Sequence, residues 1–168
     1  FRTATNVLST QMKATGEVMS VGRTLEESLL KAIRSLETGL CHIHSKKFDD
    51  MRTDAIMKYI ECGRDDRICA IAELIRRNVD LGLIYNKTQI DMFFLDKIVN
   101  IIKEENLVKE NKGNIEVLKH AKKMGFSDKY IGKVWGKSES EIYLLRKENN
   151  IYPVYKMIDT CASEFKSY

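Results

Sequence analysis

The longest apolar stretch of the chain runs from Thr88 to Leu107, TQIDMFFLDKIVNIIKEENL, and its spacing predicts a helix. Thr88, followed three residues later by Asp91, predicts the N-terminal cap. On a helical wheel the polar residues fall on one narrow stripe, which Phe93 interrupts, and apolar residues cover the other sides. This pattern favours a central helix with other helices around it, and the alternative is a surface helix with one apolar face.

Shorter helices are predicted on both sides of this stretch. Before it they are Thr24–Glu37, with a capping box of Thr24 and Glu27, Asp54–Glu61, a helix capped by Asp65, and a single turn within Asp80–Asn86. After the charged link Lys109–Gly113 they are Asn114–Met124, Ser127–Trp135 and a helix opened by the capping box of Ser138 and Glu141. We therefore predict an all-α fold, an irregular helical bundle of two packed clusters.

Both ends of the chain favour extended structure. Glu17–Val21, between two glycines, and Ile151–Cys161, with Pro153 near its start, have strand-like composition or alternation. A single strand leaves its backbone N–H and C=O groups unpaired, so each strand would need a sheet elsewhere. We expect short extended segments at both termini and three parts: residues 1–23, a helical domain over 24–150, and a linker over 151–168.

Composition restricts the class of protein. The chain has 168 residues, 43% apolar and 31% charged, and no apolar run approaches the ~20 residues that span a bilayer, so we expect no membrane partner. Its four cysteines form no CxxC motif and no disulfide framework, and no signal peptide precedes them. A cytoplasmic location is the simplest interpretation.

Three candidate chemistries can be weighed from the residues. His42 and His44 lie close together, but the only other histidine is the distant His120, so a solvated loop over Leu40–Asp50 is favoured over a metal site. The segment around Gly132 and Gly136 lacks the spacing and the preceding strand of a phosphate loop, so these glycines indicate a close packing contact and a helix end. No nucleophile motif occurs, and we expect no catalytic, cofactor-binding or metal-binding residue.

A DNA-binding helix-turn-helix is the main alternative function. Residues 112–150 contain nine Lys/Arg and five Asp/Glu and thus carry the whole net charge of +4, and their short helices have the right rhythm. However, the recognition helix would begin with Glu139 and Glu141, which repel phosphates, and Ile131, Trp135 and Ile142 are more simply core residues. We therefore expect no nucleic-acid partner.

The run TQMKATGEVMSVGRT from Thr10 to Thr24, followed by LEESL, resembles the large subunit of carbamoyl phosphate synthetase. The resemblance continues through Asp66–Ile68, Ile71–Ala72, Asn86–Leu95 and Ala162–Phe165, where Ser163 replaces the usual alanine, and it is weakest over Leu40–Asp50. It places residues 1–23 at the tail of the first ATP-grasp half, 24–150 in the helical connection or oligomerisation domain, and 151–168 at the entry to the second half.

The resemblance also implies a function. The parent enzyme would be an ATP-dependent, glutamine-hydrolysing ligase that makes carbamoyl phosphate from bicarbonate, glutamine-derived ammonia and two ATP for pyrimidine and arginine biosynthesis. It would use magnesium or manganese and potassium, and its partners would include a small glutaminase subunit. This segment, without the catalytic loops, would be inactive alone, connecting the two ATP-grasp halves and self-associating. By the same resemblance, Met12 and Glu17 would line the tunnel that carries carbamate.

Overall fold

The computed structural model describes residues 7–10, 16–36 and 38–159, and its regular structure there is helical throughout. The elements are α1 (Leu25–Ser35), a 3₁₀ turn η1 (Lys46–Phe48), α2 (Thr53–Tyr59), α3 (Arg67–Arg76), α4 (Leu81–Thr88), α5 (Met92–Glu110), α6 (Ile115–Lys123), α7 (Asp128–Trp135) and α8 (Glu139–Glu148). The predicted all-α class is confirmed.

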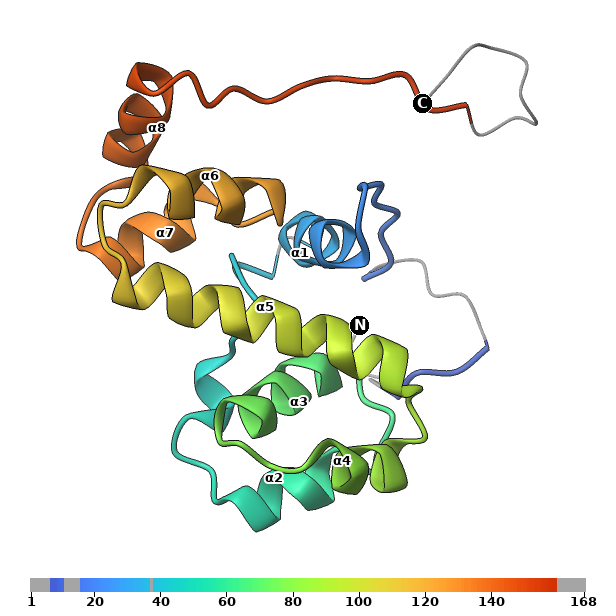
Figure 1. The fold of residues 1–168 in the computed structure, drawn as a ribbon. Helices are drawn as coiled ribbons and strands as arrows, with labels where there is room; N and C mark the ends of the chain where they lie inside the picture. The colour runs from blue at the N-terminus through green and yellow to red at the C-terminus, as the bar shows by residue number, and fades with distance from the viewer. Residues whose placement is uncertain (1–6, 11–15, 37, 160–168) are drawn as a thin grey trace.

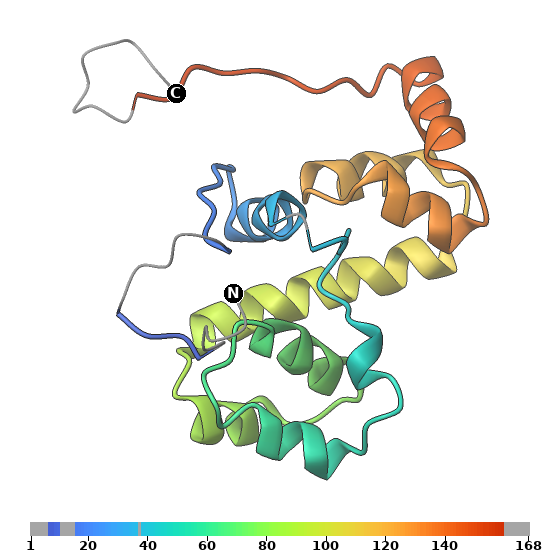
Figure 2. The same cartoon turned by 180° about the vertical axis from the view of Figure 1, so that it is seen from behind.

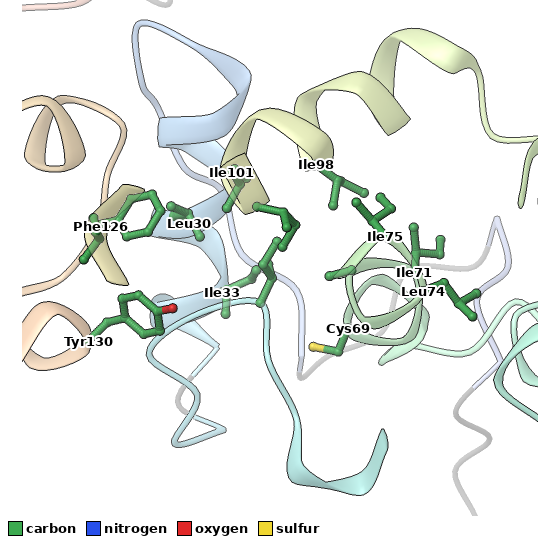
Figure 3. Packing of buried hydrophobic residues seen from close by; sticks show 14 of the residues in the cluster. Leu30, Ile33, Cys69, Ile71, Leu74, Ile75, Ile98, Ile101, Phe126 and Tyr130 are labelled. Atoms are coloured by element: carbon green, nitrogen blue, oxygen red, sulfur yellow. The ribbon is translucent and has the colours of Figure 1, made fainter. Parts of the chain in front are cut away.

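Helix α5 is the central element of the fold. It contacts α3 and α4 on one side and α1, α6 and α7 on the other, so two helical clusters lie on opposite sides of it (Figures 1 and 2). The core runs without a break through both clusters: Ile98 and Ile101 of α5 lie between Ile71 and Ile75 of α3 and Leu30 of α1 (Figure 3). The prediction of a bundle of two packed clusters around a central helix is therefore confirmed.

The central helix begins later than predicted. Thr88 is the last residue of α4, where its hydroxyl donates to the carbonyl of Ile84 at 2.8 Å and accepts from the backbone N–H of Ile90 at 3.2 Å. The cap is Asp91, whose carboxylate accepts the N–H of Phe93 at 2.8 Å. The single turn predicted within Asp80–Asn86 is instead the start of a helix of eight residues, which continues to Thr88.

Burial of α5 is also less complete than predicted. Its buried side chains, Leu95, Ile98, Ile101, Ile102, Glu104, Glu105 and Val108, lie on about one half of the helix when each residue turns it by about 100°. In the first turn Met92, Phe93 and Phe94 are 38%, 54% and 48% exposed. Other helices therefore surround α5 only in part, because no helix in the described residues covers this side of its first turn.

Helix starts in the second cluster follow the predicted caps. Asn114, Ser127 and Ser138 each accept a backbone N–H from the first turn of α6, α7 and α8, and Ser138 with Glu141 forms the complete capping box. Helix α1 joins this cluster rather than the group of α2 and α3: a Cβ added to Gly125 would lie only 3.1 Å from the Cα of Glu27. The turn between α6 and α7 therefore packs directly on α1.

The segment Leu40–Asp50 is not the solvated loop that the sequence predicted. His42 is 2% exposed, and Ile43 and Phe48 are fully buried. Apart from one 3₁₀ turn, this segment is irregular, although its apolar residues belong to the common core. Its sequence therefore lacks the 3.6-residue spacing by which a buried helix is recognised, and its burial was not predicted.

Neither predicted strand is present in the described parts of the terminal segments. Residues 17–21 and 151–159 contain no β-strand, and Thr160 and Cys161 lie outside the described residues. The one isolated bridge in the described chain joins Val7 to Arg64. Because strand propensity is realised only beside another strand, the described parts of these two segments form no sheet.

Candidate functional site

The two residues predicted to line a carbamate tunnel cannot both be compared with the structure. Met12 lies outside the described residues, and Glu17 is exposed in the segment before α1. The described residues contain no group of three or more His, Cys, Asp or Glu side chains placed to hold a metal ion. Two of the polar clusters inside the bundle are centred on buried carboxylates, Glu105 and Asp128.

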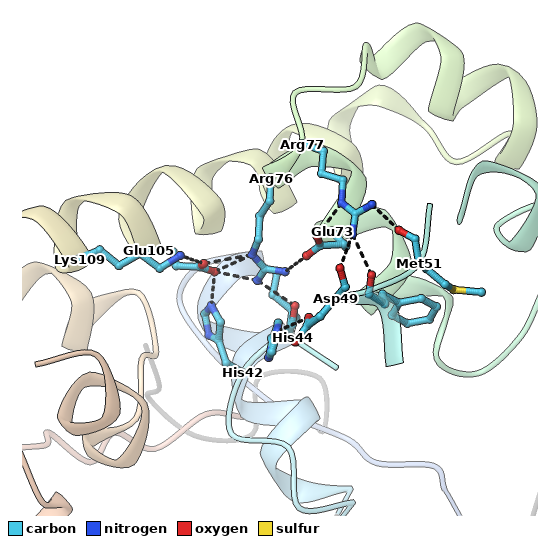
Figure 4. A network of polar contacts seen from close by, with 11 residues as sticks. His42, His44, Asp49, Met51, Glu73, Arg76, Arg77, Glu105 and Lys109 are labelled. Atoms are coloured by element: carbon cyan, nitrogen blue, oxygen red, sulfur yellow. Dashed lines mark hydrogen bonds and ion pairs between the residues drawn. The ribbon is translucent and has the colours of Figure 1, made fainter. Parts of the chain in front are cut away.

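The first cluster is centred on Glu105 of α5, which is 3% exposed (Figure 4). Arg76 of α3 donates to its carboxylate from Nη2 at 2.7 Å and from Nε at 3.1 Å, and Lys109 donates from the next turn of α5. Burial raises the pKa of Glu105, but hydrogen bonds from His42 and Arg76 and the charge of Arg76 outweigh it and hold the pKa far below its usual range. The carboxylate is therefore ionised inside the core.

His42 connects the Leu40–Asp50 segment to this carboxylate. Its Nε2 lies 3.1 Å from Glu105 Oε2, and its ring stacks on Tyr130 with centroids 3.9 Å apart. Burial lowers the pKa of His42, although the hydrogen bond to Glu105 opposes the shift. A neutral ring that donates from Nε2 fits this setting, because Nδ1 is buried with no partner among the described residues.

Arg77 fastens the same segment at a second point. Its guanidinium donates to the carbonyls of Met51, Phe48 and Asp49 at 2.6, 2.9 and 3.0 Å, and its Nε donates to Glu73 at 2.8 Å (Figure 4). One side chain at the end of α3 thus donates to three carbonyls of an irregular segment, of which only that of Phe48 also accepts a backbone N–H, from Met51 at 3.2 Å. The cluster holds irregular chain in a fixed position.

The second cluster is centred on Asp128 at the start of α7. Arg146 of α8 donates to it at 2.9, 3.0 and 2.6 Å, and Lys122 of α6 lies 2.9 Å away. Burial raises the pKa of Asp128, but the bonds from Arg146 and Lys122 outweigh it and lower the pKa overall. Arg146 also donates to the carbonyl of Ile151 at 3.0 Å, which positions the start of the C-terminal segment.

These clusters can position chain segments, and they lack a nucleophile with a neighbouring base. Cys69 is buried, and burial raises the pKa of its thiol to about 11, which keeps it protonated and unreactive. A comparison with known protein families assigns the domain. The model of the carbamoyl-phosphate synthetase large chain oligomerisation domain matches residues 17–150. The chain belongs to this family.

In this carbamoyl-phosphate synthetase domain, the candidate recognition helix presents negative charge. Glu139 and Glu141 are exposed in the first turn of α8, and Glu141 is bonded to Ser138. Ile131, Trp135 and Ile142 are buried, as predicted for core residues. A Cβ added to Gly132 would lie 2.6 Å from the carbonyl oxygen of Lys137, and Gly136 ends α7 with a φ of 72°, so both glycines have the structural roles predicted for them.

The first turn of α5 presents an exposed apolar surface on this oligomerisation domain. Met92, Phe93 and Phe94, which we call the first-turn patch, are all exposed, and the two phenyl rings meet edge to face at 5.3 Å. Phe94 also borders a groove of about 260 Å³ with Leu25, Ile68 and Ile90. No helix among the described residues is long and apolar enough to cross a membrane. Exposed aromatic groups of this kind are typical of protein interfaces.

Sequence reasoning missed the residues of both polar clusters. Charged residues such as Glu105, Arg76 and Asp128 are usually exposed to solvent, so the sequence alone gives no reason to place them in the core. The available signal was indirect: on the helical wheel, Glu105 falls among the apolar positions of α5 rather than in its polar stripe.

Proposed function

We propose that this chain is the non-catalytic connection and oligomerisation segment of a carbamoyl phosphate synthetase large chain. The observation that carries the proposal is the family match over residues 17–150. The parent ligase would make carbamoyl phosphate in the cytoplasm from bicarbonate, glutamine-derived ammonia and two ATP, for pyrimidine or arginine synthesis. It would use magnesium or manganese and potassium, with ammonia supplied by a small glutaminase subunit.

The work of the segment is mechanical. It holds the two ATP-grasp halves of the parent chain at a fixed separation, because both helical clusters pack on α5 and share one core. The buried ion pairs of Glu105 and Asp128 fix the irregular segments that a helix bundle alone would leave loose. Met12 and Glu17 precede this scaffold, and they would line the passage through which carbamate reaches the second half.

The first-turn patch is the surface we assign to self-association, with a second copy of the chain as its partner. A contact between two such patches would bury Met92, Phe93 and Phe94, which are otherwise in water at a cost of about 25 cal/mol per Å² of apolar surface. The family's description as an oligomerisation domain supports this choice of partner.

Sedimentation velocity over a range of protein concentrations tests the association. The wild-type chain should form a larger species as concentration rises, and Phe93→Ser combined with Phe94→Ser should remain monomeric. The matched control is Tyr143→Ser, which removes another half-exposed aromatic residue, on α8, and should associate like wild type. Association unchanged by the double substitution would refute the assigned surface, and a monomeric wild type at all concentrations would refute self-association by the chain.

An ATPase assay on the same chain tests the other half of the proposal. The isolated segment should release no phosphate above the blank, because its described residues include no arrangement of nucleophile and base or of metal ligands. ATP hydrolysis that copurifies with the protein through two columns and follows its concentration would contradict the non-catalytic assignment.

A further inference from the structure

A groove of about 260 Å³ adjoins the first-turn patch. Its walls are mainly apolar and include Leu25 and Leu29 of α1, Ile68 and Ile71 of α3, and Phe94 of α5. Phe94 is 48% exposed and belongs to the patch as well, so the patch and the groove form one continuous surface. A cavity of about 150 Å³ is enough to hold benzene, so this groove has room for an aromatic side chain.

The groove carries an excess of positive charge where α3 begins. Its charged lining residues are Arg64, Asp65 and Arg67, and neither arginine side chain forms a hydrogen bond or an ion pair with the described residues. The Arg64 guanidinium lies over the ring of Tyr59, 5.0 Å from its centroid. Arg67, at the first position of α3, has no such ring contact among the described residues. A guanidinium beside an apolar groove suits a partner that presents an apolar group together with a carboxylate.

The first turn of α5 carries that combination on its own surface. Phe93 is 54% exposed, and Asp96, three residues later, is exposed on the same side of the helix. Asp96 forms no hydrogen bond or ion pair with the described residues. Lys97, the next residue along α5, lies 3.6 Å from Glu26 of α1 and therefore has another counter-charge. A phenyl ring and an unpaired carboxylate thus lie next to a groove with the complementary features.

We propose that Phe93 of one copy of the chain inserts into the groove of a second copy, where Asp96 of the first pairs with Arg67 of the second. The second copy makes the same contacts in return. Because Phe93 and the groove both adjoin Phe94, a two-fold rotation between the copies can place each phenyl ring at the other groove. The inference rests on the proposed self-association through the first-turn patch, and it adds the groove that receives the patch and the ion pair that makes the contact specific.

Sedimentation velocity of charge-reversed variants tests the ion pair. Asp96→Arg and Arg67→Glu should each weaken association about tenfold or more, because two-fold symmetry turns an attraction into a repulsion at two places. Both variants should fold, since arginine suits an exposed helix position and glutamate suits the first turn of a helix. Lys58→Glu and Asp50→Arg make the same changes of charge at exposed positions outside the groove, and they should associate like wild type.

An equal mixture of the two charge-reversed variants is the decisive sample. In the mixed dimer, the new arginine at position 96 faces the new glutamate at position 67, and the unchanged Asp96 faces the unchanged Arg67. Both contacts are then attractive, so the mixture should associate to within about threefold of wild type although neither variant does so alone. Native mass spectrometry should show the one-to-one complex as the main dimer.

Insertion of the aromatic ring is tested with Phe93→Trp. The tryptophan emission should shift to shorter wavelength as concentration rises, because the indole leaves water for the groove of a second copy. The single native tryptophan, Trp135, is 7% exposed and gives a constant background. Tyr143→Trp, on α8, should show no shift with concentration.

The outcomes separate this contact from self-association in general. Association that survives both charge reversals, a mixture that associates no better than its components, or an emission of Phe93→Trp that does not change with concentration would each overturn the groove contact. If Phe93→Ser with Phe94→Ser still abolishes association in those cases, the first-turn patch remains the associating surface and the groove has a different occupant. A wild-type chain that is monomeric at all concentrations overturns both proposals.

Discussion

Replacing Glu105 by glutamine tests the idea that a buried ion pair holds the irregular Leu40–Asp50 segment in place. The substitution keeps the shape of the side chain but removes the closer counter-charge of Arg76, whose side chain is only 14% exposed, and leaves Glu73, 3.6 Å from its Nη1, as the remaining one. Removing one partner of a buried pair costs about 3–5 kcal/mol. The glutamine oxygen still accepts one bond, and Lys109 is 47% exposed and contributes little, so we expect the lower end, about 3 kcal/mol.

Urea unfolding followed by circular dichroism at 222 nm measures this loss directly. The melting temperature should also fall by roughly 6–12 °C, since each kcal/mol shifts it by about 2–4 °C in a domain of this size. Glu110→Gln, an exposed change on the same helix, should stay within about 0.5 kcal/mol of wild type. A loss below about 1 kcal/mol for Glu105→Gln would show that the network does not hold this segment.

The same variant predicts a change in pH dependence. The pKa of Glu105 is lower in the folded protein than in the unfolded chain, so its contribution is complete above the unfolded pKa of about 4.3 and is lost as pH falls below it. The stability difference between wild type and Glu105→Gln should therefore narrow between pH 5 and pH 3. A difference that stays constant over this range would contradict the assignment of an ionised Glu105.

Three further predictions concern other buried groups. The folded-state pKa of His42 is lowered by burial, so wild type should lose stability as pH falls from 7 to 5, and His42→Leu should flatten this dependence in urea titrations; an unchanged slope would refute it. Gly132→Ala should cost about 1–3 kcal/mol despite the better helix propensity of alanine, because its Cβ would meet the Lys137 carbonyl at 2.6 Å; a stabilised variant would refute the close contact. Iodoacetamide should label the exposed Cys62 well before Cys69, as mass spectrometry of digests can show, and equal rates would contradict the burial of Cys69.

The sequence predicts the helices of the second cluster well because each carries its own start signal. Asn114, Ser127 and Ser138 act locally on the first turn that follows them, so their effect does not depend on distant contacts. Thr88 has the same kind of side chain, but α4 continues to Thr88, so Asp91, three residues later, is the N-cap of α5. Where two possible N-caps lie three residues apart, the packing of the helices decides which one is used, and local propensity does not.

The candidate sites could not be predicted because they depend on residues far apart in the chain. The contact between His42 and Glu105 joins residues 63 positions apart, and no periodic pattern encodes it. Glu104 differs from Glu105 by one position in sequence, yet Glu104 contacts His120 of α6 and Glu105 contacts Arg76 of α3. Only the placement of α1, α3 and α6 around α5 distinguishes the two.

Because the two clusters pack on a single helix, the number of residues in α5 sets the distance between them. Its 19 residues extend over about 28 Å at 1.5 Å each. Adding or deleting one residue between Leu95 and Val108 would also rotate one cluster against the other by about 100°, separating side chains that now meet in the core. The length of this segment is thus fixed by geometry, because each of its residues sets both the separation and the relative rotation of the two clusters.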